Sequence, residues 1–318
     1  MGRATRGASL EAEAAFPAAR LRWPARLDDR ATLARVLIAP AVLFIAVLVG
    51  GPLVLSLFLS LTDATAGSLS GNFIGGDNFS RALESTIFRH TVFNTFLFTL
   101  ASQVAVVVAA TALAHVLLRN FRGKWLLRFL ILLPWAAPIS LGTIGWKWIF
   151  DSLYSVLNWT LRFVHILRPE DFPVWLGDPN LAQVSIISVQ AWRLIPFATV
   201  IMIAGLSKIP QEIEDAALVD GAHGWRRMVY ITTPLLLPIA TIAVLFGVVF
   251  TAADMTVVYV LTGGGPFNST HVLPSWAFQI GIVSGSLGSG AAIAIYLFPL
   301  LVLVTIAGLT FARRLEVT

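Results

Sequence analysis

Six long apolar stretches constrain what this sequence can fold into. They cover residues 36–61, 91–118, 126–150, 181–206, 235–261 and 289–311. An α-helix needs about 20 apolar residues to cross the hydrocarbon core of a membrane, and each stretch reaches that length. Because the backbone polar groups of a chain in lipid must be satisfied within the chain, the sequence predicts an all-α integral membrane protein with six transmembrane helices.

The composition agrees with lipid as the main solvent of the chain. Hydrophobic residues make up 57% of the 318 residues and charged residues 12%, whereas a soluble domain usually carries about a quarter charged residues. The mean hydropathy is +0.81. Since cysteine is absent, a disulfide framework, a thiolate metal site and a cysteine nucleophile are all excluded.

The positive charges between the stretches predict the orientation of the chain. Connections on one side of the membrane would hold sixteen Lys and Arg residues, and connections on the other side would hold four. By the positive-inside rule, the richer side is cytoplasmic. We therefore expect both termini and the loop at 207–234 to be cytoplasmic.

The chain divides into three expected parts. Residues 1–35 contain seven arginines and no sustained apolar period, which predicts a cytoplasmic tail without a fold of its own. Residues 36–61 form the first transmembrane anchor, which exceeds the apolar region of about 7–15 residues in a cleaved secretory signal. Residues 90–312 are expected to form a core domain of five helices that contains the cytoplasmic loop.

That loop, which precedes the fifth apolar stretch, predicts a helix, a turn and a second helix. Pro210 suits the first position of a helix, and the acidic residues after it favour the positive end of the helix dipole. Gly221 can adopt the left-handed conformation that ends a helix. We expect a second short helix over 225–233, limited by Pro234 and Pro238 before the chain re-enters the membrane.

The same loop resembles the signature loop of the permease subunits of bacterial ATP-binding-cassette (ABC) importers, in the maltose-type, carbohydrate-uptake branch. The family pattern is E-A-A-x-x-D-G-A followed by I-x-L-P. It is matched by Glu214 or Asp215 as the acid, then by Ala216, Ala217, Asp220, Gly221 and Ala222, and later by Ile231-Thr232-Thr233-Pro234. The resemblance implies a coupling helix that sits in a groove of a separate ATPase subunit. Asp215 replaces the usual Glu, and Glu214 could substitute for it; an ordinary amphipathic hairpin at the membrane surface is the alternative.

Three further stretches resemble the same family and extend the likeness over nearly everything after residue 35. They are Gly75 to Phe79, Leu133 to Pro138, and Leu261 to Pro266. The last contains three glycines and a proline, which end a helix on steric grounds alone, but its position after the fifth stretch is typical of the family. The resemblance implies the type I ABC importer permease fold in a bacterial cytoplasmic (inner) membrane.

Polar residues in the fourth and fifth stretches predict the solute path, because such residues are costly in lipid and usually face the protein interior. At helical spacing they form one face on each stretch. The predicted path consists of Gln190, Arg193, Leu194 and Phe197 with Gly247, Phe250, Thr251 and Asp254. These positions are similar to those that line the sugar site of maltose-type permeases, and their mixture of polar and aromatic groups suits a hydroxylated solute. Simple charge neutralisation between Arg193 and Asp254 is the alternative.

Neither a metal site nor a catalytic site is predicted in this chain. The five histidines show no metal-ligand spacing. No G-x-x-x-x-G-K-[ST] phosphate loop occurs, so we expect this chain to bind no cofactor and not to be an enzyme. The resemblance instead places ATP and Mg²⁺ on the separate ATPase.

The resemblance implies a permease subunit of an ATP-driven, binding-protein-dependent importer for a sugar or a related polyol or glycoside. The implied partners are a second similar permease subunit, two ATPase subunits, an extracytoplasmic solute-binding protein and membrane lipid, with no nucleic acid. Glycerol phosphate is an alternative solute. An ion-coupled secondary transporter is less favoured, because Asp254 is the only strong acidic candidate within a span. A membrane-embedded glycosyltransferase would require paired acids that the external connections lack.

Overall fold

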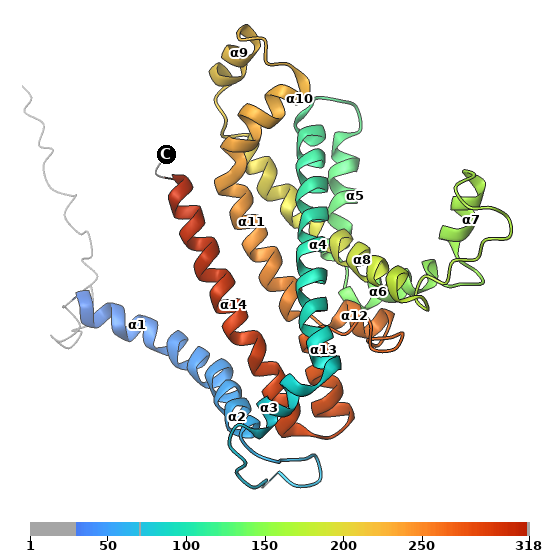
Figure 1. Cartoon of the computed structure of the whole chain (residues 1–318). Helices are drawn as coiled ribbons and strands as arrows, with labels where there is room; N and C mark the ends of the chain where they lie inside the picture. The colour runs from blue at the N-terminus through green and yellow to red at the C-terminus, as the bar shows by residue number, and fades with distance from the viewer. Residues whose placement is uncertain (1–29, 70, 317–318) are drawn as a thin grey trace, which may run out of the picture. The chain divides into compact units, whose positions relative to one another are not determined.

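The computed structural model describes residues 30–69 and 71–316, and the regular secondary structure of this part of the chain is helical apart from two isolated β-bridges (Figure 1). The chain separates into two compact units, residues 1–54 and 55–318. Most of the expected tail lies outside the described residues. The all-α prediction is confirmed.

The first unit contains one long apolar helix, whose end continues into the second unit. Helix α1 (Arg30–Ile45) passes through a π-helical turn, η2 (Ala46–Gly50), into α2 (Gly51–Ser60). The segment Ala31–Ser60 has a mean hydropathy of 2.7 over its most apolar window, which is enough to cross a membrane. It coincides with the predicted anchor.

Four further helices of the described chain are long and apolar enough to span a membrane, and they agree with the prediction for the second, fourth, fifth and sixth stretches. They are α4 (Thr86–Leu118), α8 (Pro179–Leu206), the continuous helix Gly224–Ala253, and α14 (Leu287–Glu316). With the first helix they make five spans.

The third predicted helix, over 126–150, is wrong as a single element. It consists of α5 (Lys124–Ala136) and α6 (Ile139–Ile149), which meet at an angle of 102°. The residue before a proline is pushed out of the helical region, and Ala137, before Pro138, has an extended backbone with ψ 142°. The described chain therefore has six spans only if this bent pair counts as one.

Around the fifth stretch the structure differs from the prediction at both ends. The two prolines do not separate a short helix from the span, because α10 (Gly224–Arg227), η3 (Met228–Thr232) and α11 (Thr233–Ala253) form one continuous helix. The wider π-helical turn precedes Pro234 and gives the helix a local adjustment in which a proline ring can be accommodated. The predicted C-terminal part of the span is a separate helix, α12 (Thr256–Leu261).

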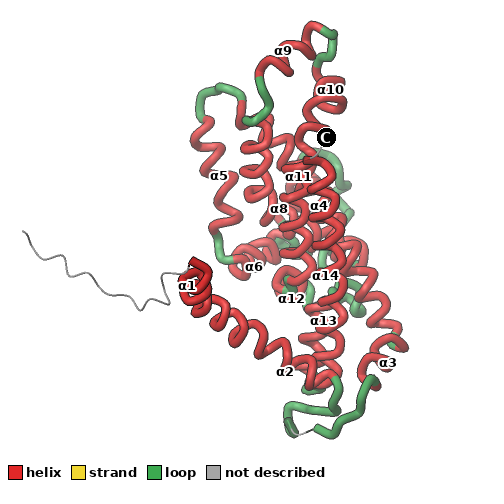
Figure 2. The backbone as a smooth tube through the Cα atoms, turned by 90° about the vertical axis from the view of Figure 1, so that its left-hand side faces the viewer, coloured by secondary structure: helices red, strands yellow, loops and turns green. Residues whose placement is uncertain are grey.

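The core of the second unit forms where α4, α8 and α11 pack together (Figure 2). Small residues on α4 and α8 allow the two helix backbones to approach closely, as is usual for membrane helices. The buried small residues of this contact are Ala110, Ala114, Ala191 and Ala198. Helix α14 packs against the other side of α11.

Short helices occupy the connections. They are α3 (Asp77–Glu84), α7 (Val156–Phe163), α9 (Gln211–Val219), α13 (Leu273–Phe278) and the π-helical η4 (Gln279–Val283). Within the second unit, α9 and α10 lie at one end and α3 and α13 at the opposite end (Figure 1). The loop that resembles a coupling loop and the glycine-rich segment before α13 are thus on opposite sides of the helical core.

Candidate functional site

Three buried polar side chains meet where α4, α8 and α11 come together. The Nε2 groups of Gln103 on α4 and of Gln190 on α8 both donate to Oγ1 of Thr251 on α11, at 3.1 and 3.0 Å. Relative exposure is 4% for Gln103 and 0% for the other two residues. The structure thus brings two predicted path residues together and adds Gln103, which the sequence prediction missed.

The two glutamines keep unused acceptor capacity. No protein donor in the described chain reaches Oε1 of Gln103 or Oε1 of Gln190, although both atoms are buried. An amide oxygen normally has a partner when it is buried, and leaving one unsatisfied costs about 1–3 kcal/mol. Both oxygens are acceptors without a partner, and they are closed off by the packed helices, so a molecule outside the chain could reach them only after the helices separate.

Arg193 of α8 and Asp254 form an ion pair beside this polar cluster. Asp254 lies just after the last residue of α11 rather than within the helix, and its Oδ1 accepts a hydrogen bond from the backbone N–H of Thr256 at 2.7 Å. The side chains of the pair remain 21% and 18% exposed. The pair is consistent with charge neutralisation, and its partial exposure leaves it accessible to a ligand.

Aromatic side chains line a neighbouring surface of the same helices. Phe197 of α8 stacks on Trp135 of α5, with ring centroids 5.0 Å apart and an interplanar angle of 19°. The edges of Phe246 and Phe250 approach Phe197 at 6.0 and 6.5 Å. Phe197 and Phe250 were predicted as path residues, whereas Trp135 and Phe246 were not. Together the four rings form an aromatic wall.

Two predicted path residues have a different place. Leu194 is 2% exposed and belongs to the apolar core between α4 and α8, so it packs the helices together. Gly247 faces Gln103, and a Cβ atom there would lie 2.7 Å from Cδ and 2.8 Å from Nε2 of that glutamine. The glycine makes room for the amide and does not itself line a surface.

The loop that resembles a coupling loop forms a helix with a well-defined end. Pro210 immediately precedes α9, one residue earlier than expected. Gly221 has φ +74°, its N–H donates to the carbonyl of Leu218 at 3.1 Å, and the N–H of Ala222 donates to the carbonyl of Ala217 at 2.8 Å. This pair of bonds is the Schellman motif. The motif fixes where α9 stops and where the chain turns toward α10.

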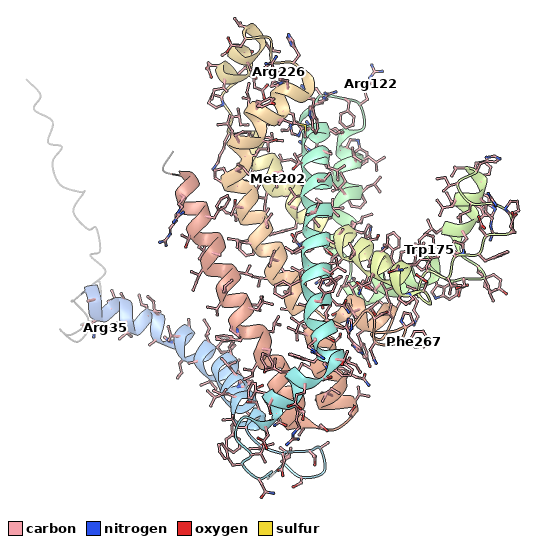
Figure 3. All side chains as sticks on the ribbon, viewed as in Figure 1. Arg35, Arg122, Trp175, Met202, Arg226 and Phe267 are labelled. Atoms are coloured by element: carbon pink, nitrogen blue, oxygen red, sulfur yellow. The ribbon has the colours of Figure 1, made fainter. Side chains whose placement is uncertain are left out.

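The two candidate acids of this loop have different surroundings. Asp215 is exposed and accepts a hydrogen bond from Nε2 of Gln211 at 3.2 Å. Glu214 is half-buried, with a carboxylate oxygen 3.9 Å from a guanidinium nitrogen of Arg227 on α10. Because Glu214 approaches α10, its position does not favour the hypothesis that it replaces the family Glu on the outer surface of the loop. Arg226 of α10 and Arg122 lie at this same end of the second unit (Figure 3).

The glycine-rich segment Leu261–Pro266 packs against a buried histidine. His271 is 2% exposed, and its Nδ1 lies 3.0 Å from Oγ of Ser275. Gly264, with φ +89°, leaves no space for a side chain, because a Cβ atom there would overlap the imidazole ring. Burial lowers the pKa of His271 from 6.5 to about 4. The glycine is therefore required by both backbone conformation and packing.

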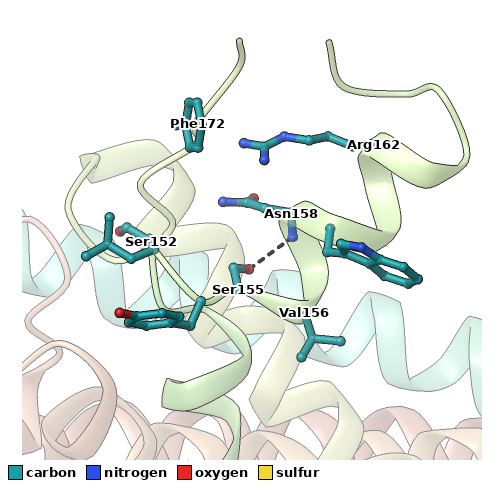
Figure 4. Close-up of a pocket in the computed structure, with 9 residues that line it drawn as sticks. Ser152, Ser155, Val156, Asn158, Arg162 and Phe172 are labelled. Atoms are coloured by element: carbon teal, nitrogen blue, oxygen red, sulfur yellow. Dashed lines mark hydrogen bonds between the residues drawn. The ribbon is translucent and has the colours of Figure 1, made fainter. Parts of the chain in front are cut away.

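A separate pocket of about 340 Å³ lies in the connection 151–178, around α7 (Figure 4). The guanidinium carbon of Arg162 lies 4.1 Å from the ring centroid of Phe172, and Nη2 of Arg162 donates to the carbonyl of Asp171 at 2.6 Å. Tyr154 and Trp159 line the pocket and are 84% and 66% exposed. Exposed aromatic rings of this kind are typical of protein interfaces.

Within the described residues, no group of three or more His, Asp or Glu side chains could hold a metal ion. The ionisable groups of the candidate path are an ion pair, not a catalytic constellation. The arrangement can bind a polar solute but supplies no nucleophile with an adjacent base.

Comparisons with known proteins identify the family of the chain. Residues 105–317 match the family of binding-protein-dependent transport system inner membrane components. Among curated relatives, the sulfoquinovosyl glycerol transport system permease protein SmoG of Agrobacterium fabrum is 33% identical over 297 residues, which cover 92% of this chain and 94% of SmoG. The trehalose/maltose transport system permease protein MalF of Thermococcus litoralis is 31% identical, over 89% of this chain and 94% of the relative.

A solved structure shows the same fold. A chain of a bacterial alginate ABC transporter, crystallised in complex with an alginate pentasaccharide-bound periplasmic protein, superposes with a TM-score of 0.74 at 17% identity, covering 89% of this chain and 94% of that chain. The predicted type I ABC importer permease fold is thereby confirmed. The chain belongs to the family of binding-protein-dependent transport system inner membrane components, and it is a multi-pass permease subunit of an ABC importer.

Proposed function

We propose that this permease carries a sugar, or a related polyol or glycoside, between α4, α8 and α11. The observation that carries the proposal is the pair of buried amide oxygens on Gln103 and Gln190 that no protein donor reaches; in this proposal they become accessible when the helices separate during transport. Hydroxyl groups of a sugar are donors of the required kind. The aromatic wall beside them offers faces on which the apolar side of a sugar ring can stack.

The charges at the site favour a neutral or weakly charged solute. The positive charge of Arg193 is already neutralised by Asp254, so an anion would have to displace the carboxylate to bind the guanidinium. Glycerol phosphate is therefore the second candidate. The names of the two relatives above, which refer to sulfoquinovosyl glycerol and to trehalose and maltose, support a glycoside as the class of solute, whereas the preference for a neutral one rests on the ion pair alone, since a sulfoquinovosyl group carries a sulfonate.

The energy source in this proposal is a separate polypeptide. Two ATPase subunits bind ATP and Mg²⁺, and α9 docks on one of them through its exposed face, which includes Asp215, Ala216 and Asp220. A second, similar permease subunit completes the path and contributes its own loop. Since a ligand shifts a conformational equilibrium only by its differential affinity for the two states, ATP must bind more tightly to one state, and α9 conveys that difference to α8 and α11.

In this proposal the end of the second unit that carries α9 is cytoplasmic, together with both termini. The turn between α4 and α5 lies at that end and is rich in Lys and Arg, as the positive-inside rule requires. The connection around α7 is then extracytoplasmic. Its exposed Tyr154 and Trp159 support docking of an extracytoplasmic solute-binding protein on this segment.

The test is ATP-driven uptake in vesicles that contain the permease pair, the ATPase and the binding protein. Sugars are first identified by thermal-shift screening of the binding protein. We expect Asp254→Asn and Gln190→Ala to reduce uptake at least about tenfold while assembly and ATP hydrolysis persist. The control is Thr241→Ala on α11, whose hydroxyl bonds only the carbonyl of Leu237 in its own helix.

Three outcomes would contradict the proposal. Uptake that persists without ATP, or a chain that purifies with no ATPase subunit, would rule out the importer. Normal uptake kinetics in both Asp254→Asn and Gln190→Ala would remove the polar cluster from the solute path. A loss of assembly in Thr241→Ala as well would show that the helices, not the site, had been disturbed.

A further inference from the structure

A cavity of about 490 Å³ lies beside the coupling loop, away from the solute path. Its walls come from the C-terminal end of α4, from α9 and from the first turns of the helix at 224–253, and Leu206 at the end of α8 contributes to it. Ligand pockets commonly have volumes of about 300–1,000 Å³. None of the predicted path residues lines this cavity.

Positive groups outnumber negative groups in the cavity. Two guanidinium groups, of Arg119 and Arg227, line it together with a single carboxylate, that of Glu214, and with the His115 ring. The 3.9 Å between the Arg227 and Glu214 side chains is too long for a hydrogen bond, so Arg227 keeps its donors. Within the part of the chain that the structure describes, no carboxylate lies within 4.0 Å of Arg119.

The hydrogen-bonding groups of the cavity suit an acceptor. Each guanidinium group is a donor only. Nδ1 of His115 is used within α4, where it lies 2.8 Å from the carbonyl oxygen of Thr111, so the guanidinium groups are the charged donors of the cavity. The rest of the lining includes apolar side chains such as Leu118 and Met228. A ligand with an anionic head and an apolar attachment matches both features.

The position of the cavity along the helices favours a lipid source for that head. Apolar helix α4 ends at Leu118, and the helix at 224–253 begins at Gly224, so the cavity lies where two spans leave the apolar layer. Phospholipid headgroups occupy that level. Arg122 lies at the same end of the second unit (Figure 3) and forms no ion pair among the described residues, and basic residues at this level attract anionic lipid.

We propose that this cavity binds a phosphate group, supplied by an anionic membrane phospholipid. The phosphate lies between Arg119 and Arg227 and accepts charge-assisted hydrogen bonds from both guanidinium groups, for which phosphate geometry is well matched. It competes with Glu214 for Arg227, so a bound lipid alters how α9 is held against α10. The binding site stands independently of the proposed function, whereas its effect on coupling rests on it.

Binding is tested on the purified full-length permease in detergent by native mass spectrometry and by thermal shift. The probes are dioleoyl phosphatidylglycerol, dioleoyl phosphatidylcholine and inorganic phosphate. We expect saturable binding of phosphatidylglycerol, and an affinity reduced at least about tenfold by Arg119→Gln and by Arg227→Gln, as expected for loss of one hydrogen bond to a charged group. Arg226→Gln is the matched control, because it removes the same charge from the adjacent, exposed residue outside the cavity.

The arms of the experiment separate the sources of the ligand. Saturable binding of inorganic phosphate alone, lost in both cavity variants, would support the phosphate site and overturn the lipid as its source. An equal loss in Arg226→Gln would overturn the site in favour of general surface attraction. If the cavity variants bind lipid normally but no longer associate with the ATPase, the phosphate site is overturned. The arginines would then pair with a carboxylate of the ATPase subunit. The binding test needs neither ATP nor solute. It can therefore fail while the proposed function stands, and the proposed function can fail while lipid binding is confirmed.

Discussion

Gly247→Ala tests how closely α11 and α4 must approach to build the polar cluster. The added Cβ atom would lie 2.7 Å from Cδ of Gln103, well inside ordinary van der Waals contact. Displacing the amide costs about 1–3 kcal/mol as overpacking, and losing its bond to Thr251 costs about 1 kcal/mol. The higher helix propensity of alanine relative to glycine stabilises the variant by about 0.5–1 kcal/mol. We expect a net loss of about 1–3 kcal/mol.

The assay is unfolding of the purified permease in mixed micelles, followed by tryptophan fluorescence, with uptake measured in parallel. Gly145→Ala in α6 is the control, because nothing lies within 4 Å of a Cβ atom at that position, so we expect it to be neutral or slightly stabilising. Gln103→Ala removes the amide that Gly247→Ala displaces. The two substitutions together should therefore be less destabilising than the sum of the two alone, with a coupling energy of about 1–2 kcal/mol.

The reasoning is refuted if Gly247→Ala raises stability as Gly145→Ala does, since the close approach would then cost nothing. Additive effects of Gly247→Ala and Gln103→Ala would also refute it. A stable Gly247→Ala protein with lost uptake would assign the position to the solute path directly, contrary to the packing role argued above.

Four other outcomes are expected. Gly264→Ala should destabilise the protein by at least about 2 kcal/mol, since it adds both strain at φ +89° and overlap with His271; thermal unfolding against Gly145→Ala checks this. The pKa of His271 is lowered to about 4, so the unfolded state binds more protons between pH 6.5 and 4, and up to about 3 kcal/mol of stability should be lost as pH falls through that window. A pH series of unfolding free energies should be flatter in His271→Asn. Trp135→Ala should raise the solute concentration for half-maximal uptake several-fold with ATPase association unchanged, because it removes one stacked ring.

The long spans could be predicted from the sequence because hydrophobic length decides them. Helices α4, α8 and α14 follow the apolar stretches to within a few residues, since lipid requires a continuous hydrogen-bonded helix. The bend at Ala137 could not be predicted in this way, because hydropathy stays high on both sides of Pro138 and only the backbone effect of the proline marks the break. At Pro234 the proline does not break the helix, because the π-helical turn before it accommodates the proline ring.

The candidate site was partly predictable for a related reason. Gln190, Arg193 and Thr251 stand out as polar groups in apolar surroundings, and burial cost is a property of the single residue. Gln103 carries the same signal, but its partner on α11 depends on Gly247 and on the approach of two helices 148 positions apart. Asp254 was expected on a helix and instead follows one, because the end of α11 is set by local backbone geometry that hydropathy does not report.

In the proposed function, the polar cluster favours hydroxylated solutes without binding them too tightly for release. Thr251 accepts one N–H from each amide group, so the second N–H of each glutamine and both amide oxygens remain without a protein partner. The amide oxygens of Gln103 and Gln190 are already removed from bulk water. A solute that donates to them therefore causes no further desolvation cost for these two protein groups. If each hydroxyl contributes about 1–1.5 kcal/mol, two of them improve affinity by roughly 30–150-fold. The free energy from these two hydrogen bonds is far smaller than that of micromolar binding, about 8 kcal/mol. Most of the binding free energy would then come from the aromatic wall, and a helix movement could release the solute.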